Sequence, residues 1–210
     1  MGERDMPERR NRSDIVFAKN YLPPTDWYNS SEVYEDLVTL FENANQKLLC
    51  KDFDLIEQNV SERTVCGNLM LHLSRSLWGT PFRLYHIDVE YNRNKNGRVK
   101  TIIDHSEVVT NITCDLIVHS RGKYKVQDNL LALEMKKSNR KNSEKQKDKN
   151  RLVALTGDGN SAWSYDGETL PDHVCRYILG VYYEIDLYNR CIYIEFYYHG
   201  KLKSSKTIII

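Results

Sequence analysis

The sequence has no long apolar segment and no cysteine framework, and each absence excludes a class of protein. No run approaches the ~18 apolar residues of a membrane-spanning helix, and residues 1–20 lack the apolar stretch that a signal peptide needs. The cysteines number five, none of them in a CxxC pair: Cys50, Cys66, Cys114, Cys175 and Cys191. This pattern fits neither a disulfide framework nor a zinc knuckle. We therefore expect a cytoplasmic protein with reduced thiols and no membrane partner.

The sequence also has almost no net charge. Its 30 Lys and Arg against 29 Asp and Glu leave +1, which excludes a uniformly basic nucleic-acid binder. The charge is nevertheless segregated, because residues 1–62 carry 7 basic and 13 acidic side chains whereas residues 92–151 carry 15 and 7. A polyanionic partner would therefore meet a local basic patch in the middle of the chain.

The length and the hydrophobic pattern indicate one domain of mixed structure. A chain of 210 residues favours a single domain. Residues 1–30 are polar, contain a Pro-Pro pair and have no sustained periodicity, so we expect an N-terminal arm followed by one domain over residues 31–210. The order of elements, two helices, three strands, a helix and two strands, predicts an α/β (α+β) fold with a mixed central β-sheet flanked by helices.

The expected elements rest on periodicity and on capping residues. Ser31 is expected to cap the first helix, in which Val33, Leu37, Leu40, Phe41, Ala44 and Leu48 form an apolar stripe. A second helix is expected from Ser61 to about Trp78, and a third from a capping box of Ser143 and Gln146 to Thr156. Strands are expected at residues 82–91, 112–119, 129–136, 176–186 and 190–199.

Charged residues are concentrated at the end of the third strand. Glu134 and Lys136 follow the apolar run 130–133 and project from one strand face because their spacing is two. Antiparallel pairing with the preceding strand would bring Asp115 beside Glu134. Glu62, at the start of the second helix, points toward that helix's buried face. Buried charges are costly unless they have partners or a task.

Two carboxylates converging beside a lysine suit a hard divalent cation. Mg²⁺ takes oxygen ligands and typically uses one or two protein carboxylates plus substrate phosphate. Asp115 and Glu134 would hold Mg²⁺, with Mn²⁺ expected to substitute. Such an ion would lower the pKa of a water and stabilise charge on a phosphodiester, while Lys136 would position the water or offset charge at phosphorus.

The combination resembles a known nuclease superfamily. Asp115 followed by Glu134-Met135-Lys136 resembles the D…ExK signature of the PD-(D/E)XK, or restriction-endonuclease-like, nucleases. Within that superfamily the chain is similar to a group of small bacterial or phage proteins over about residues 55–200, through Ser61-Glu62-Arg63, the run 88–93, the run 114–119 and Asn129-Leu130-Leu131. Cys114 stands where the superfamily often has proline, a position that does no chemistry.

The resemblance implies a restriction-endonuclease-like fold and a metal-dependent nuclease. It makes Asp115 and Glu134 metal ligands, Lys136 the catalytic lysine and Glu62 a further carboxylate of the site. DNA is favoured over RNA as the substrate, the role would lie in phage–host conflict or DNA processing, and a homodimer would suit cutting both strands. The alternative is a catalytically inactive nuclease-fold protein that binds nucleic acid or takes part in protein assembly.

Several of these residues also have purely structural interpretations. Glu134 and Lys136 are also typical of a buried salt bridge at a sheet edge, and Glu62 is also typical of a favourable charge in a first helical turn. Asp88 and Glu90 share a strand face and either flank the site or face solvent. His119 is better explained as a structural histidine than as a ligand, and the Tyr-rich strands as strand formers than as base-stacking surfaces.

The basic segment after the third strand is the candidate nucleic-acid contact. Residues 136–151 hold eight Lys and Arg and two acids. Lys145 and Lys149 lie on one side of the expected helix, and Arg93 belongs to a basic loop. We expect these three to contact phosphates, which would position a nucleic acid without reading its sequence. The alternative is a solvated helix face and loop.

Overall fold

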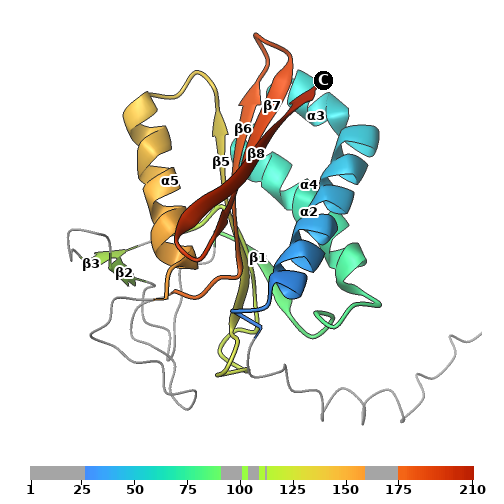
Figure 1. The fold of residues 1–210 in the computed structure, drawn as a ribbon. Coiled ribbons are helices and arrows are strands. Elements are labelled where there is room, and N and C mark those ends of the chain that lie inside the picture. The colour runs from blue at the N-terminus through green and yellow to red at the C-terminus, as the bar shows by residue number, and fades with distance from the viewer. Residues whose placement is uncertain (1–26, 91–100, 104–108, 112, 159–174) are drawn as a thin grey trace, which may run out of the picture.

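A six-stranded mixed sheet lies between two helix layers in the computed structural model, which describes residues 27–90, 101–103, 109–111, 113–158 and 175–210 (Figure 1). The strand order is β1-β4-β5-β6-β7-β8, and β2 and β3 form a separate pair. In chain order the elements are α2 (Ser31–Lys51), α3 (Phe53–Glu57), α4 (Glu62–Leu77), β1 (His86–Val89), β2 (Thr101–Ile103), β3 (Val109–Asn111), β4 (Leu116–His119), β5 (Asn129–Lys137), α5 (Asn142–Thr156), β6 (Leu179–Asp186), β7 (Cys191–Tyr198) and β8 (Lys201–Ile209). The mixed sheet with flanking helices is therefore confirmed.

The sheet changes direction around its buried central strand. β1, β4 and β5 form an antiparallel meander, and β5 and β6 run parallel because α5 connects them as a crossover. β7 and β8 then add in antiparallel fashion. The first seven residues of β5 are buried, as expected of a strand covered on both faces. None of the helices in the described ranges is long and apolar enough to cross a membrane.

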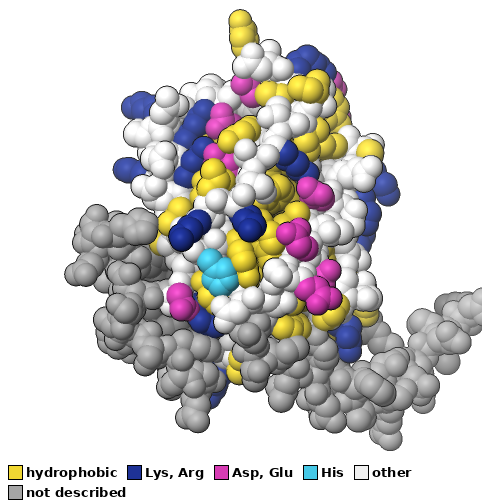
Figure 2. Space-filling model, viewed as in Figure 1, with side chains coloured by type: hydrophobic (Ala, Val, Ile, Leu, Met, Phe, Trp, Pro, Cys, Tyr) yellow, Lys and Arg dark blue, Asp and Glu magenta, His cyan; other side chains and the backbone are white. Residues whose placement is uncertain are grey.

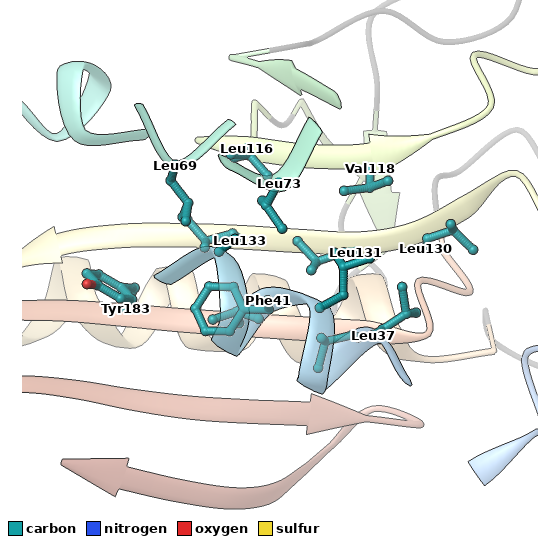
Figure 3. Close-up of a cluster of buried hydrophobic side chains, with 14 of the residues drawn as sticks. Leu37, Phe41, Leu69, Leu73, Leu116, Val118, Leu130, Leu131, Leu133 and Tyr183 are labelled. Carbon is teal, nitrogen blue, oxygen red and sulfur yellow. The ribbon is translucent and has the colours of Figure 1, made fainter. Parts of the chain in front are cut away.

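The helices α2 and α4 cover one face of the sheet and form the main core with it (Figure 3). Figure 3 shows side chains of α2, α4, β4, β5 and β6 directed at one another, with Leu37, Phe41, Leu69, Leu73, Leu116, Leu131 and Leu133 among them. Each fully buried leucine or phenylalanine contributes roughly 1.5–3 kcal/mol relative to exposure. The apolar stripe predicted for the first helix is buried here apart from Val33, which is partly buried.

The helix α5 covers the opposite face through a smaller apolar cluster. Leu152 and Leu155 pack there with Ile117 and Ala132. The earlier turns of α5 carry charged side chains toward the sheet. Figure 2 shows Lys and Arg side chains gathered over α5 and Asp and Glu side chains over α2. The basic segment of the sequence thus forms much of the outer surface of α5.

Two predicted helix starts are wrong in detail. Ser30, not Ser31, caps α2, since its side chain accepts a hydrogen bond from the Val33 amide at 3.3 Å. The capping box predicted for the third helix is absent: α5 begins at Asn142, and Ser143 lies inside its first turn. The extended backbone of Lys141 starts this helix without a side-chain cap, and Gln146 instead bonds Asn150. Ser61 caps α4 as predicted, accepting from Thr64.

The strand predicted at 82–91 is shorter than expected, and β8 was not predicted. The Thr80 hydroxyl donates to the Leu77 carbonyl and accepts from the Phe82 amide, which holds residues 81–84 in turns and leaves only β1 as strand. The N-terminal arm was predicted to extend to residue 30, but Trp27 and Tyr28 are already buried in the fold. Residues 1–26 of that arm lie outside the described residues.

Candidate active site

Asp115 and Glu134 come together where β4 and β5 pair. The two strands are antiparallel with Leu116 facing Leu133, so Asp115, one residue before β4, adjoins Glu134 and Met135. Leu133 belongs to the core on the α2–α4 side, whereas Ala132 packs against α5. Strand alternation therefore places Glu134 and Lys136 on the α5 side. The predicted pairing of the two carboxylate-bearing segments is confirmed.

Asp115 is held by the backbone of the neighbouring strand. Its Oδ2 accepts a hydrogen bond from the Met135 amide at 2.7 Å. Burial raises the pKa of this carboxyl, although that hydrogen bond and the nearby Lys136 ammonium act to lower it. Asp115 is thus a desolvated carboxyl with one oxygen fixed in direction.

Glu134 is the most deeply buried acid of the group, with 1% of its surface exposed. Its Oε1 accepts a hydrogen bond from Arg151 Nη1 at 2.6 Å. Burial raises the pKa of Glu134 to about 8 even so, and the negative charges of Asp115 and Asp148 add to the shift. Burial therefore outweighs the pairing with Arg151 and favours the neutral form of this carboxyl.

Lys136 turns to α5 rather than to Glu134. Its Nζ lies 3.1 Å from Asp148 Oδ2, and Asp148 Oδ1 lies 3.3 Å from Arg151 Nη1. Burial lowers the pKa of Lys136, but Asp148 and Asp115 outweigh it, and the net direction is upward. The alternative of a Lys136–Glu134 salt bridge at a sheet edge is wrong, because β5 is an interior strand and each side chain has its own partner on α5.

The sequence analysis missed Asp148 and Arg151, which complete this cluster. Asp148 lies four residues before Leu152 and seven before Leu155, so it occupies the apolar stripe of α5. An acid at a core position of a basic helix is the signal that could have found it. Within this buried region, Lys136 and Arg151 are the cations that contact Glu134 and Asp148. Burial is the main cause of the raised pKa values of Asp115 and Glu134, and the neighbouring carboxylates add to it.

Glu62 reaches the same end of β5 from the other helix layer. Its Oε1 accepts a hydrogen bond from the Lys137 amide at 3.0 Å and lies 3.7 Å from Arg140 Nε. It thus points toward the sheet, as predicted, and its negative charge also acts on Lys136. The amide that it binds belongs to the residue after Lys136, so Glu62 borders the cluster at the strand end.

The site offers two carboxylates as possible ligands of a divalent cation. Within the part of the chain that the structure describes, no group of three or more His, Cys, Asp and Glu side chains gathers closely enough to hold a metal ion. Asp115 and Glu134 still offer carboxyl oxygens close to each other where β4 and β5 pair. A hard cation that keeps several waters needs no more than one or two such ligands.

The lysines predicted to contact phosphate have carboxylate partners inside the fold. Lys145 donates to Glu184 at 2.7 Å, and Lys149 donates to Glu195 at 2.8 Å. Lys149 also lies 4.6 Å from the centre of the Tyr182 ring. Arg93 lies outside the described residues. Phosphate contact by Lys145 and Lys149 would require them to leave these partners, so it remains a prediction.

The other charged residues singled out from the sequence have local partners. His119 lies 2.9 Å from Asp88, which also forms an ion pair with Arg121. The structural interpretation of His119 is therefore supported. Glu90 turns away to Arg63 at 3.3 Å. In the Tyr-rich strands, Tyr182, Tyr183 and Tyr197 are buried and pack within the fold rather than offering rings to bases.

Comparisons with known proteins add no further constraint. No protein-family model matches the chain, and neither the curated proteins nor the solved structures give a significant match.

Proposed function

We propose that this protein is a Mg²⁺-dependent nuclease that hydrolyses phosphodiester bonds, with DNA favoured as its substrate. The observation that carries the proposal is that the desolvated carboxyls of Asp115 and Glu134 come together where β4 pairs with β5, beside Lys136. The D…ExK resemblance and the mixed sheet covered by helices on both faces support the same assignment.

Each residue has a defined task in this proposal. Asp115 and Glu134 would hold the cation, which when bound would supply an acidified water and polarise the phosphate. Lys136 would place its ammonium beside the reacting phosphate and offset the negative charge that develops there. Arg151 contacts both Glu134 and Asp148, so it would keep Asp148 as a partner if Glu134 turned to the cation.

The test combines metal binding with cleavage of single-stranded DNA, duplex DNA and RNA. Glu134→Gln removes a ligand while keeping its shape, and the raised pKa of Glu134 makes the neutral amide easy to accommodate. We expect it to lose Mn²⁺ binding by calorimetry and at least about 100-fold in cleavage. Lys136→Met should retain Mn²⁺ and lose cleavage. Glu144→Gln, an exposed acid on the same α5, is the matched control. Cleavage that survives both site substitutions contradicts the assignment.

A second candidate is a nuclease-fold module that binds nucleic acid or another protein without cutting. It is favoured by the ion pairs that already occupy Glu134 and Lys136 and by the lack of a third metal-ligating side chain in the described residues. Nucleic-acid binding that is equal in wild type and Glu134→Gln, needs no metal and never leads to cleavage would select this candidate.

A further inference from the structure

A groove runs between α2 and α4 on the outer side of their layer. The two helices are antiparallel neighbours, with Asp52 bonded to His72 at 2.5 Å and Lys47 to Ser76 at 3.2 Å. Two adjoining hollows lie along them and share Asn43 and Ser76. The larger, of about 440 Å³, is lined by Asn43, Gln46, Lys47, Cys50, Lys51, Arg75, Ser76 and Trp78. We call this larger hollow the α2–α4 groove.

The α2–α4 groove is positively charged although α2 as a whole is acidic. Lys47, Lys51 and Arg75 line it, and no carboxylate does. Lys51 and Arg75 take part in no ion pair with any residue that the structure describes, and Lys47 bonds only a serine hydroxyl. The three cations therefore keep their charge available, unlike Lys145 and Lys149 on the other side of the sheet.

An exposed indole borders these cations. Trp78 is the C-cap of α4, and 74% of its surface is exposed. The other described tryptophan, Trp27, is 5% exposed. Trp78 therefore offers a large aromatic face at the surface, beside the three cations of the groove.

We propose that the α2–α4 groove binds a short stretch of single-stranded nucleic acid. One base stacks on Trp78, and phosphates lie at Lys47, Lys51 and Arg75. Lys47 and Lys51 are one helical turn apart, with Cβ atoms about 5–6 Å from each other, so they can follow successive phosphates. An aromatic platform beside a basic track is how single strands are bound without sequence preference.

The neighbouring groups favour nucleic acid over an acidic peptide. The groove offers the side-chain amides of Asn43 and Gln46, which can pair with base edges, and its lining residues include no aliphatic side chain that would hold a peptide anchor. The groove also lies apart from the candidate active site. Glu62 and Arg75 occupy opposite ends of α4, about 20 Å apart at 1.5 Å per residue. The groove therefore holds the strand and does not present the scissile phosphate.

The test is made in EDTA, so that binding is measured without cleavage and its outcome is separate from that of the nuclease proposal. A fluorescein-labelled oligothymidylate is titrated with the full chain, and its anisotropy is recorded. Trp78→Ala should weaken binding roughly 5- to 150-fold, the range for loss of one stacked base. Lys47→Gln with Lys51→Gln should weaken it as well. Leu71→Ala, another exposed apolar residue of α4, is the matched control and should bind as wild type does.

A footprint locates the contact without relying on substitutions. Cys50 lines the groove and is the exposed cysteine, whereas Cys191 is partly buried on β7. Oligothymidylate should slow alkylation of Cys50 and leave Cys191 unchanged. The proposal is overturned if Trp78→Ala and Leu71→Ala bind alike, if Cys50 is not protected, or if polyglutamate protects Cys50 better than the oligonucleotide does.

Discussion

At the scale of single residues, the ion pair of Glu134 with Arg151 joins a fully buried acid to a half-buried base. Removing Arg151 would leave Glu134 buried and unpaired, so Arg151→Met should lower the free energy of unfolding by about 3–5 kcal/mol. Replacing both partners with Glu134→Leu and Arg151→Met should recover part of that loss, because Glu134 is no longer stranded and Asp148 keeps Lys136 as its partner. Urea unfolding of the two single variants and the double variant measures the coupling.

The matched control for this cycle is Arg63→Met. Arg63 pairs with Glu90 at 3.3 Å, but 72% of its side chain is exposed, so its loss should cost no more than about 1 kcal/mol. A double variant no more stable than Arg151→Met alone would show that Glu134 is not stranded by the loss of its partner.

Glu195 gives the fold a defined pH dependence. Burial acts to raise the pKa of this carboxyl, but hydrogen bonds from Lys149, Tyr197 and Tyr193 outweigh burial and hold it below the ordinary value of 4.5. A carboxyl whose pKa is lowered by folding contributes stability above its unfolded pKa and loses it as the pH falls through the folded value. The melting temperature of wild type should therefore exceed that of Glu195→Gln at pH 7, and the difference should shrink below about pH 4.5. Thermal unfolding by circular dichroism from pH 7 to pH 2.5 measures this, and a difference independent of pH would contradict it.

At the scale of elements, α5 packs closely against the sheet at Gly180 of β6. A Cβ on Gly180 of β6 would come within 2.9 Å of Thr156 Cγ2 and 3.0 Å of Tyr197 Cβ. Gly180→Ala should therefore displace α5 from the sheet and lower the free energy of unfolding by about 1–3 kcal/mol. Gly67 of α4 meets nothing within 4 Å, so Gly67→Ala should raise it by about 0.5–1 kcal/mol. Denaturant titration compares the two variants, and equal effects on the free energy of unfolding would contradict the close packing of α5 at Gly180.

The elements predicted correctly from the sequence are those with a strong local signal. The stripe of α2 and the Ser61 cap of α4 are set within a few residues of chain, so periodicity finds them. β8 was missed because its residues 201–209 are mostly exposed and polar, and an edge strand shows no apolar alternation. The start of α5 was misplaced because Ser143 has a capping composition but Lys141 has the extended backbone.

At the scale of the whole molecule, half of the candidate active site follows from sequence and half does not. Asp115 and Glu134 could be placed together because antiparallel pairing of neighbouring strands brings them into register. The positions of Asp148 and Arg151 in the site depend on how α5 packs against the sheet after the crossover, and no local sequence pattern determines that packing. The partners of Lys145 and Lys149 likewise come from β6 and β7, about 40 residues later in the chain.

The near-zero net charge makes salt dependence a sharp test of where a polyanion binds. With a formal charge of +1, the molecule attracts nucleic acid weakly at long range, so the salt slope reports mainly local phosphate contacts. Three contacts in the α2–α4 groove predict a slope of log K against log salt near −2, at about −0.7 per phosphate of a single strand. Lys47→Gln with Lys51→Gln should bring it to about −0.7, whereas neutralising the exposed Lys147 of α5 should leave it unchanged. Anisotropy titrations from 50 to 200 mM salt measure the slopes. A slope near −2 that persists without Lys47 and Lys51 would place the polyanion on another surface.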